Sequence, residues 1–316
     1  MNNDDAVREW ARIRGYRVAF GPVAILEEVR RSFERRRKSG EIEARFFKDN
    51  LAAFTYLNGA AIKNPQSIII IALPKPAHIL TFTVGDKIIE TLLPPTYVRY
   101  RKTFAEVRDD LAETLEPSGF RVELLNAPLK ALSNRLGLLS YGRNNVGYIE
   151  GLGSYFQLVG LVSDMPLAAG SPPPSPAETL LPRCHKCRIC AAACPTGAIE
   201  KERILLHAER CYTLFSESLN PIPEELKPPS PKCLIGCLRC QELCPENKGL
   251  LRHKPASVSF DAEETEAFLG IKPAAEGPAF DRAQAMFREL GLTAGLPLFR
   301  RNLKRLLKLR GLLQEG

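Results

Sequence analysis

Apolar and polar positions alternate along the chain in ways that predict both strands and helices before residue 170. Residues 67–73 form a continuous apolar run, rich in isoleucine and stopped by Pro74, which predicts a strand buried on both faces and central in a sheet. Residues 79–84 and 87–92, joined by Gly85-Asp86, predict a β-hairpin. Two more strands are predicted at residues 121–125 and 155–162.

Helical spacing of apolar residues occurs in several other segments. In residues 22–38 the apolar side chains fall on one face, and Pro22 suits a first helical turn. After Cys244 the chain is expected to be mostly helical, because the same spacing returns there. The other predicted helices are 104–115, 128–136, 280–290 and a last helix with the buried stripe Phe299, Leu303, Leu306 and Leu307.

Two of these helices carry dense positive charge, at the end of residues 22–38 and on the exposed faces of the last helix. Such faces can bind nucleic acid or membranes. Cations are also favoured near a helix C-terminus. We therefore interpret the first as a solvated face and the last as a docked surface helix.

The run of residues 170–176 is rich in proline and predicts a stiff, extended connector. Before it, alternating strands and helices indicate an α/β arrangement, and the whole chain is expected to be α+β. The predicted domains are an α/β domain at 1–170, a linker at 171–178, a cysteine-rich domain at 179–250 and a helical extension at 251–316 that packs back on the core.

Composition changes this picture little. The 316 residues are 45% hydrophobic and 25% charged, as in ordinary soluble globular proteins. No run approaches the roughly 20 apolar residues of a membrane span, and the polar start, Met-Asn-Asn-Asp-Asp, does not resemble a secretory signal. A cytoplasmic location is expected. The net charge of +8 permits an anionic partner but does not demand one.

Nine cysteines, all between Cys184 and Cys244, carry the strongest chemical signal. The first four have the C-x2-C-x2-C-x3-C-P spacing of bacterial two-cluster ferredoxins, in which the cysteine before proline ligates the other 4Fe-4S cluster. Disulfides would need an oxidising compartment, and zinc sites usually show paired CxxC or Cys/His sets. Two interlocked 4Fe-4S clusters are therefore predicted, with His185 as a neighbour of a cluster and not a ligand.

The spacing assigns most ligands and leaves one open. One cluster is expected to take Cys184, Cys187, Cys190 and Cys244. The other is expected to take Cys194, Cys237 and Cys240, together with either Cys211 or Cys233.

Four stretches, in this order, resemble the epoxyqueuosine reductases and, more distantly, the reductive dehalogenases. The resemblance runs from about residue 15 to 310, and its third stretch favours Cys211 as the open ligand and leaves Cys233 as the spare. The stretches are Gly137-Leu-Leu-Ser-Tyr-Gly-Arg-Asn-Asn145; Gly153-Ser-Tyr-Phe156 with Ser163-Asp-Met-Pro-Leu167; Arg210-Cys-Tyr212 with Ile222-Pro-Glu-Glu-Leu226; and Gly236-Cys-Leu-Arg-Cys-Gln-Glu-Leu-Cys-Pro-Glu-Asn247.

The resemblance implies a nitroreductase-like α/β domain that binds cobalamin, followed by a ferredoxin-like domain with two 4Fe-4S clusters. A ferredoxin or flavodoxin would donate the electrons. The chain has no Asp-x-His-x-x-Gly run, since His78 follows Pro76-Ala77, so the corrinoid would be base-off. Residues implied to contact it are Tyr141, Gly142, Arg143, Asn144, Gly153 and Ser154.

The chain departs from the family at its acid. The family's aspartate, held to donate a proton, lies two residues before an Ala-Pro or Gly-Pro pair, and that position is Leu125 here. A tyrosine is the natural substitute, because an adjacent arginine could lower its pKa from about 10. Tyr100, beside Arg101, is the first candidate, followed by Tyr97 and Tyr141.

These departures favour a reductase of a small molecule or a modified nucleoside. Epoxyqueuosine in tRNA, bound by the basic last helix, is a further hypothesis. The alternative from another class is a non-catalytic electron-transfer protein with two clusters, or a reductive activator of a corrinoid enzyme.

Overall fold

The central sheet is built around β2 (Ser67–Pro74), in which every residue from Ser67 to Leu73 is buried. The strand order is β1-β2-β8-β5, with β1 at Arg17–Pro22, β8 at Phe156–Ser163 and β5 at Val122–Leu124. All three pairings are antiparallel. The predicted buried, central strand is confirmed, and the antiparallel sheet with flanking helices gives the expected α+β class.

This computed structural model describes residues 3–57, 62–169, 171–219, 221–223, 226, 232–250, 253–270, 277–292 and 295–313. The predicted connector begins at residue 170 and the motif of residues 222–226 includes 224 and 225, so these three positions lie outside the described residues.

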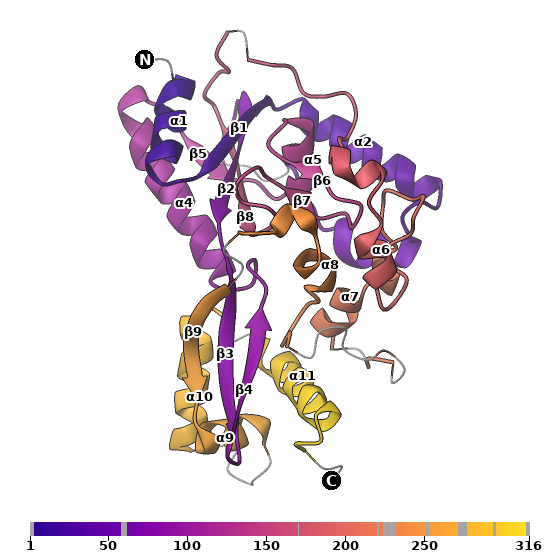
Figure 1. Cartoon of the computed structure of the whole chain (residues 1–316). Coiled ribbons are helices and arrows are strands. Elements are labelled where there is room, and N and C mark those ends of the chain that lie inside the picture. The colour runs from indigo at the N-terminus through magenta and orange to yellow at the C-terminus, as the bar shows by residue number, and fades with distance from the viewer. Residues whose placement is uncertain are drawn as a thin grey trace.

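Helices cover both faces of the sheet (Figure 1). The isoleucines of β2 alternate between the cores on the two faces. Ile69 and Ile71 pack with α1 (Asn3–Ile13) and α4 (Tyr100–Leu115). Ile68 and Ile70 pack with α2 (Ile25–Lys38) and α5 (Leu129–Arg135). The period of two along a strand explains why one apolar run serves two cores.

A second core lies below the sheet in Figure 1. The predicted hairpin is confirmed as β3 (Ala77–Val84) and β4 (Lys87–Leu93). It meets a strand that was not anticipated, β9 (His253–Phe260), which runs parallel to β3. Helices α9 (Ala262–Leu269), α10 (Pro278–Glu289) and α11 (Leu296–Leu309) complete this core, in which Phe82 stacks on Phe260 with ring centroids 4.6 Å apart.

The cluster segment, residues 179–250, is made of short elements. Its helices are α6 (Ile189–Ala193), α7 (Tyr212–Glu217) and α8 (Arg239–Glu242), with 3₁₀ turns η3 (Pro182–His185), η4 (Ala208–Arg210) and η5 (Pro245–Asn247). The small hairpin β6 (Ser140–Tyr141) and β7 (Gly147–Tyr148) reaches it from the first part of the chain. The remaining elements are α3 (Ala44–Phe46), the π-helical η1 (Phe47–Leu51) and η2 (Glu116–Ser118).

The other predicted helices and strands are found within a few residues of their expected limits. The helix expected at residues 22–38 begins at Ile25 because Pro22 ends β1. The docked last helix is confirmed: Arg301 donates to the carbonyl of Phe215 at 3.1 Å, and Arg305 donates to that of Leu226 at 2.7 Å. Among the described residues, no helix is both long and apolar enough to cross a membrane.

Candidate functional site

A cavity of about 840 Å³ lies where the central sheet meets the cluster segment. Its volume is at the upper end of the range for ligand sites. One wall, the sheet wall, comes from α2, residues 94–100, residues 124–131 and β8. The other, the cluster wall, comes from residues 205–217 and includes Cys211. A molecule bound to the sheet wall would therefore lie next to a cysteine of the cluster segment.

Gln157 of β8 lines this cavity and carries an unpaired acceptor. Its Nε2 donates to the carbonyl of Tyr100 at 3.4 Å, but its buried Oε1 has no hydrogen-bond partner among the described residues. Buried polar atoms are nearly always paired. An occupant with an N–H or O–H group would satisfy Gln157, and the amide side chains of a corrinoid meet that requirement.

Two ionisable side chains in the cavity were missed by sequence reasoning. Burial raises the pKa of Glu217, at the end of α7, to about 7. Burial lowers the pKa of Lys130, whose Nζ donates to the carbonyl of Asn145 at 3.1 Å. Both residues are open to the cavity and not packed in a core. No local pattern marks them, because only the fold brings α5 and α7 to one cavity.

The three predicted tyrosines have different surroundings. Tyr100 and Tyr141 line the cavity, whereas Tyr97 packs against the lower core and near Gly236. Although 48% of Tyr100 is open, desolvation raises the pKa of its hydroxyl group, so the lowering expected from Arg101 is not found. Burial, aided by Glu178, also raises the pKa of Tyr141 well above its usual value. The phenols of Tyr100 and Tyr141 therefore hold their protons tightly.

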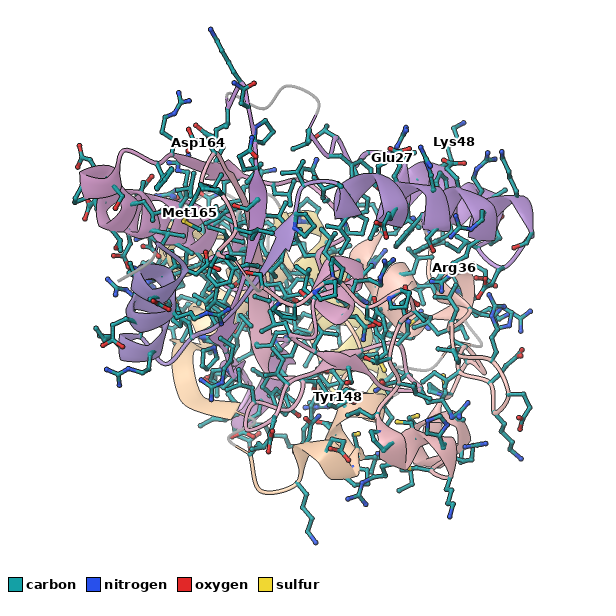
Figure 2. The ribbon with its side chains drawn as sticks, turned by 90° about the horizontal axis from the view of Figure 1, so that it is seen from above. Glu27, Arg36, Lys48, Tyr148, Asp164 and Met165 are labelled. Carbon is teal, nitrogen blue, oxygen red and sulfur yellow. The ribbon has the colours of Figure 1, made fainter. Side chains whose placement is uncertain are left out.

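The residues implied to contact a corrinoid divide into two groups. Tyr141 and Ser154 line the cavity. Arg143 turns to the cluster segment, where its Nη2 donates to the carbonyl of Cys184 at 2.9 Å. Asn144 donates to the hydroxyl of Tyr148 at 2.9 Å, and that tyrosine lies beside the cluster segment in Figure 2.

Gly142 and Gly153 serve close packing at the same junction. A Cβ at Gly142 would lie 2.6 Å from the Tyr148 ring. A Cβ at Gly153 would lie 2.2 Å from Asn247 Oδ1, the atom that accepts from the Ser154 backbone N–H at 2.9 Å. Gly153 thus lets the first part of the chain approach the cluster segment, whereas Gly142 lets the β6–β7 turn pack against Tyr148.

The cysteine thiols fall into two groups that influence each other's ionisation. Burial, then Cys184, Cys244 and Cys187, raise the pKa of Cys190 to about 11. Burial raises the pKa of Cys240 to about 12, with Cys211, Cys190 and Cys194 adding to the shift. Burial also raises the pKa of Cys237, and Cys240, Cys233 and Cys211 add to it. Thiols from both cysteine runs therefore lie close enough to influence one another's ionisation.

Cys233 has a second environment. It is buried with Ala77, Leu92 and Leu238 in a small apolar cluster beside the β3–β4 hairpin. Within the described ranges, no three Cys, His, Asp or Glu side chains gather tightly enough for a single metal ion. A 4Fe-4S cluster instead spreads its four thiolates over four iron atoms, and the two thiol groups fit that arrangement.

Comparison with known proteins agrees with this geometry. Residues 183–247 match the family model of the 4Fe-4S double cluster binding domain. The chain therefore carries such a domain, as the cysteine spacing predicted.

Curated relatives extend the similarity beyond the clusters. The chain is 30% identical over 208 residues to epoxyqueuosine reductase of Pseudomonas aeruginosa, covering 63% of this chain and 54% of that protein. It is 33% identical over 204 residues to epoxyqueuosine reductase of Alicycliphilus denitrificans, covering 63% and 52%. The chain thus spans about half the length of the curated relatives it matches.

Solved structures share the fold across nearly the whole chain. An epoxyqueuosine reductase crystallised with a tRNA-Tyr epoxyqueuosine-modified stem loop aligns with a TM-score of 0.64 at 20% identity, covering 96% of this chain and 80% of that one. A catabolic reductive dehalogenase gives a TM-score of 0.38, and nothing is inferred from it. The predicted resemblance to epoxyqueuosine reductases is confirmed.

Proposed function

We propose that the chain is a cobalamin-dependent iron–sulfur reductase whose first part, nitroreductase-like in origin, holds a base-off corrinoid in the cavity. The observation that carries the proposal is the position of Cys211 in the wall of a large cavity that also contains the unpaired Gln157 Oε1. Cobalamin bound there would supply the metal centre for the reduction. Gln157, Tyr141, Ser154 and Lys130 would contact it.

The cysteines would serve as the electron path. We assign Cys184, Cys187, Cys190 and Cys244 to one cluster, and Cys194, Cys211, Cys237 and Cys240 to the other. The mutual influence of Cys240, Cys211 and Cys194 supports this choice, and the apolar surroundings of Cys233 favour a packing role for it. A ferredoxin or flavodoxin would supply electrons one at a time.

Glu217 is the proposed proton donor in place of the family's aspartate. Two-electron reduction of the substrate takes two electrons from the external donor and two protons, one from Glu217 and one from solvent, and an epoxide oxygen would leave as water. A carboxyl whose pKa is raised to about 7 is near the optimum for general acid catalysis at neutral pH. It would give one proton to the substrate and recover it from water, whereas the raised pKa values of Tyr100 and Tyr141 disfavour those phenols.

The proposed substrate is a modified nucleoside or another small molecule and not a whole tRNA. A relative has been crystallised with a modified tRNA stem loop, but the arginines of α11 are already engaged here. Arg300 donates to the carbonyl of Phe268 at 2.6 Å, and Arg301 and Arg305 donate to carbonyls of the cluster segment. Leu125 also replaces the acid that the resemblance would require.

Cofactor analysis tests the proposal most directly. The protein is reconstituted anaerobically with iron, sulfide and cobalamin, desalted, and examined by iron counting and mass spectrometry. We expect about eight iron atoms per chain, as two 4Fe-4S clusters require, and one retained corrinoid. Iron without corrinoid would overturn the reductase and leave the electron-transfer protein.

Substrate class is tested on the loaded protein with dithionite as reductant. The probes are the free epoxyqueuosine nucleoside and the modified stem loop. Turnover of the nucleoside with little gain from the stem loop is expected. A strong preference for the stem loop, with binding that weakens steeply as salt rises, would restore tRNA as the substrate.

A further inference from the structure

A chain of neighbouring polar side chains lies between a cysteine of one proposed cluster and a cysteine of the other. The Tyr148 hydroxyl is a neighbour of the Cys244 side chain. The same hydroxyl accepts from Asn144 Nδ2 at 2.9 Å. Asn144 is in turn a neighbour of the Cys240 side chain. Cys244 belongs to the first thiol group and Cys240 to the second, so these contacts run from one cluster site to the other.

The direction of these hydrogen bonds is set by the turn between β6 and β7. The Val146 backbone N–H donates to Asn144 Oδ1 at 3.3 Å, so the amide nitrogen faces Tyr148 and Cys240. The turn is closed by the Gly142 N–H, which donates to the Val146 carbonyl at 2.8 Å. Asn144 therefore gives one N–H to the Tyr148 oxygen, which leaves its second N–H and the Tyr148 O–H available to the neighbouring sulfurs.

Burial protects the contacts of Asn144 and Tyr148 from competition with water. Asn144 is 3% exposed and Tyr148 is 4% exposed, so water competes little for either group. Donors to a cluster's sulfur ligands stabilise the added electron and raise the reduction potential. A donor shared by neighbouring clusters can thus adjust both potentials from one point of the protein.

We infer that Asn144 and Tyr148 are positioning residues that set the potentials of the two clusters relative to each other, Tyr148 through Cys244 and Asn144 through Cys240. Both side chains come from the first part of the chain and not from the cluster segment. The docking of that part onto the cluster segment thereby sets the redox properties of the clusters. This role requires the clusters but neither the corrinoid nor a substrate.

Redox titration of the reconstituted protein, followed by electron paramagnetic resonance, tests the inference. Tyr148→Phe removes one oxygen and keeps the ring. We expect the reduced-to-oxidised ratio of the Cys244 cluster, at a fixed solution potential, to fall about tenfold, the scale of a hydrogen bond to a charged group. Asn144→Leu should shift the Cys240 cluster in the same direction. Cys190→Ala and Cys237→Ala each remove one proposed ligand of one cluster. The paramagnetic signal that each variant loses or changes is thereby assigned to that cluster.

Tyr212→Phe is the matched control, because Tyr212 lies near Cys237 and Cys233 without a hydrogen bond to sulfur among the described residues. Tyr148→Phe, Asn144→Leu and Tyr212→Phe must hold the same iron as the parent. As a second readout, exchange into deuterated water should move the iron–sulfur stretching bands of the parent more than those of Tyr148→Phe. Shifts in Tyr148→Phe and Asn144→Leu no larger than in Tyr212→Phe would overturn the inference.

Discussion

The sheet wall and the cluster wall of the cavity carry different chemistry. The sheet wall offers polar groups that hold their protons or lack a partner: Tyr100, Tyr141 and Gln157, with Leu125 at the position of the family's acid. The cluster wall offers Cys211 and Glu217. Under the proposed function, electron entry and proton supply would lie on the same side, and the sheet wall would bind and orient the occupant.

This division explains how the chain can lose the family's aspartate and remain a plausible reductase. A carboxyl does not have to come from the same loop, since any wall that desolvates it can raise its pKa. Glu217 lies six residues after Cys211, on the helix that directly follows it. The cluster segment would thus supply both reactants that the sheet wall lacks.

The largest predicted effect is at Cys211. Cys211→Ala should remove one ligand of the second cluster, so that the cluster is lost or degraded and total iron falls by up to half. Cys233→Ala should keep its iron, because Cys233 packs in an apolar cluster. Iron counting and electron paramagnetic resonance measure both. The reverse pattern would move the ligand to Cys233 and take the cluster away from the cavity.

Glu217→Gln should have the next largest effect, on turnover of the nucleoside probe. Loss of a general acid typically costs about 10²–10⁴ in rate. Only the protonated carboxyl donates, so in the parent the rate should fall as pH rises through about 7. In Glu217→Gln that fall should be absent.

Tyr100→Phe is the control for Glu217 and should retain most activity. Infrared titration of the carboxyl band gives an answer independent of turnover. Two results would contradict Glu217 as the proton donor: ionisation of its carboxyl near the ordinary pKa of about 4.3, or a larger loss of turnover in Tyr100→Phe than in Glu217→Gln. Either result would point to a proton donor on the sheet wall.

Gln157→Leu tests the binding role of the sheet wall. The change keeps side-chain size and removes the unpaired acceptor, so the hydrogen bond to an occupant is lost. Corrinoid affinity, measured by equilibrium dialysis, should fall by about tenfold, the scale of one buried hydrogen bond. The iron content should not change. Unchanged affinity would mean that the occupant does not reach Gln157.

The smallest effect concerns the junction between the walls and uses two glycines with the same backbone conformation. Gly151 and Gly153 have φ of 76° and 59°, but only at Gly153 would a Cβ collide with Asn247. Gly153→Ala should therefore destabilise by about 1–3 kcal/mol more than Gly151→Ala. Thermal unfolding of the reconstituted proteins measures the difference, and equal losses would show that the walls tolerate separation.

Local patterns predicted the elements of the fold well, for a simple reason. The apolar run of β2, the β3–β4 hairpin and the stripe of α11 are decided by periods of 2 or 3.6 residues within one segment. The β9 strand was missed because its partner, β3, lies about 175 residues earlier in the chain. No local pattern reports such a pairing.

The cysteine spacing by itself predicted the two 4Fe-4S clusters, because most ligands of each cluster follow one another at short, fixed intervals along the chain. Only the tertiary structure decided what surrounds them. It brought Glu217 and Lys130 to one cavity, left Gln157 Oε1 unpaired among the described residues, and placed the hydrogen-bonded pair Asn144 and Tyr148 next to Cys240 and Cys244. These relations depend on how distant segments pack, because desolvation and hydrogen bonding act through space and not along the sequence.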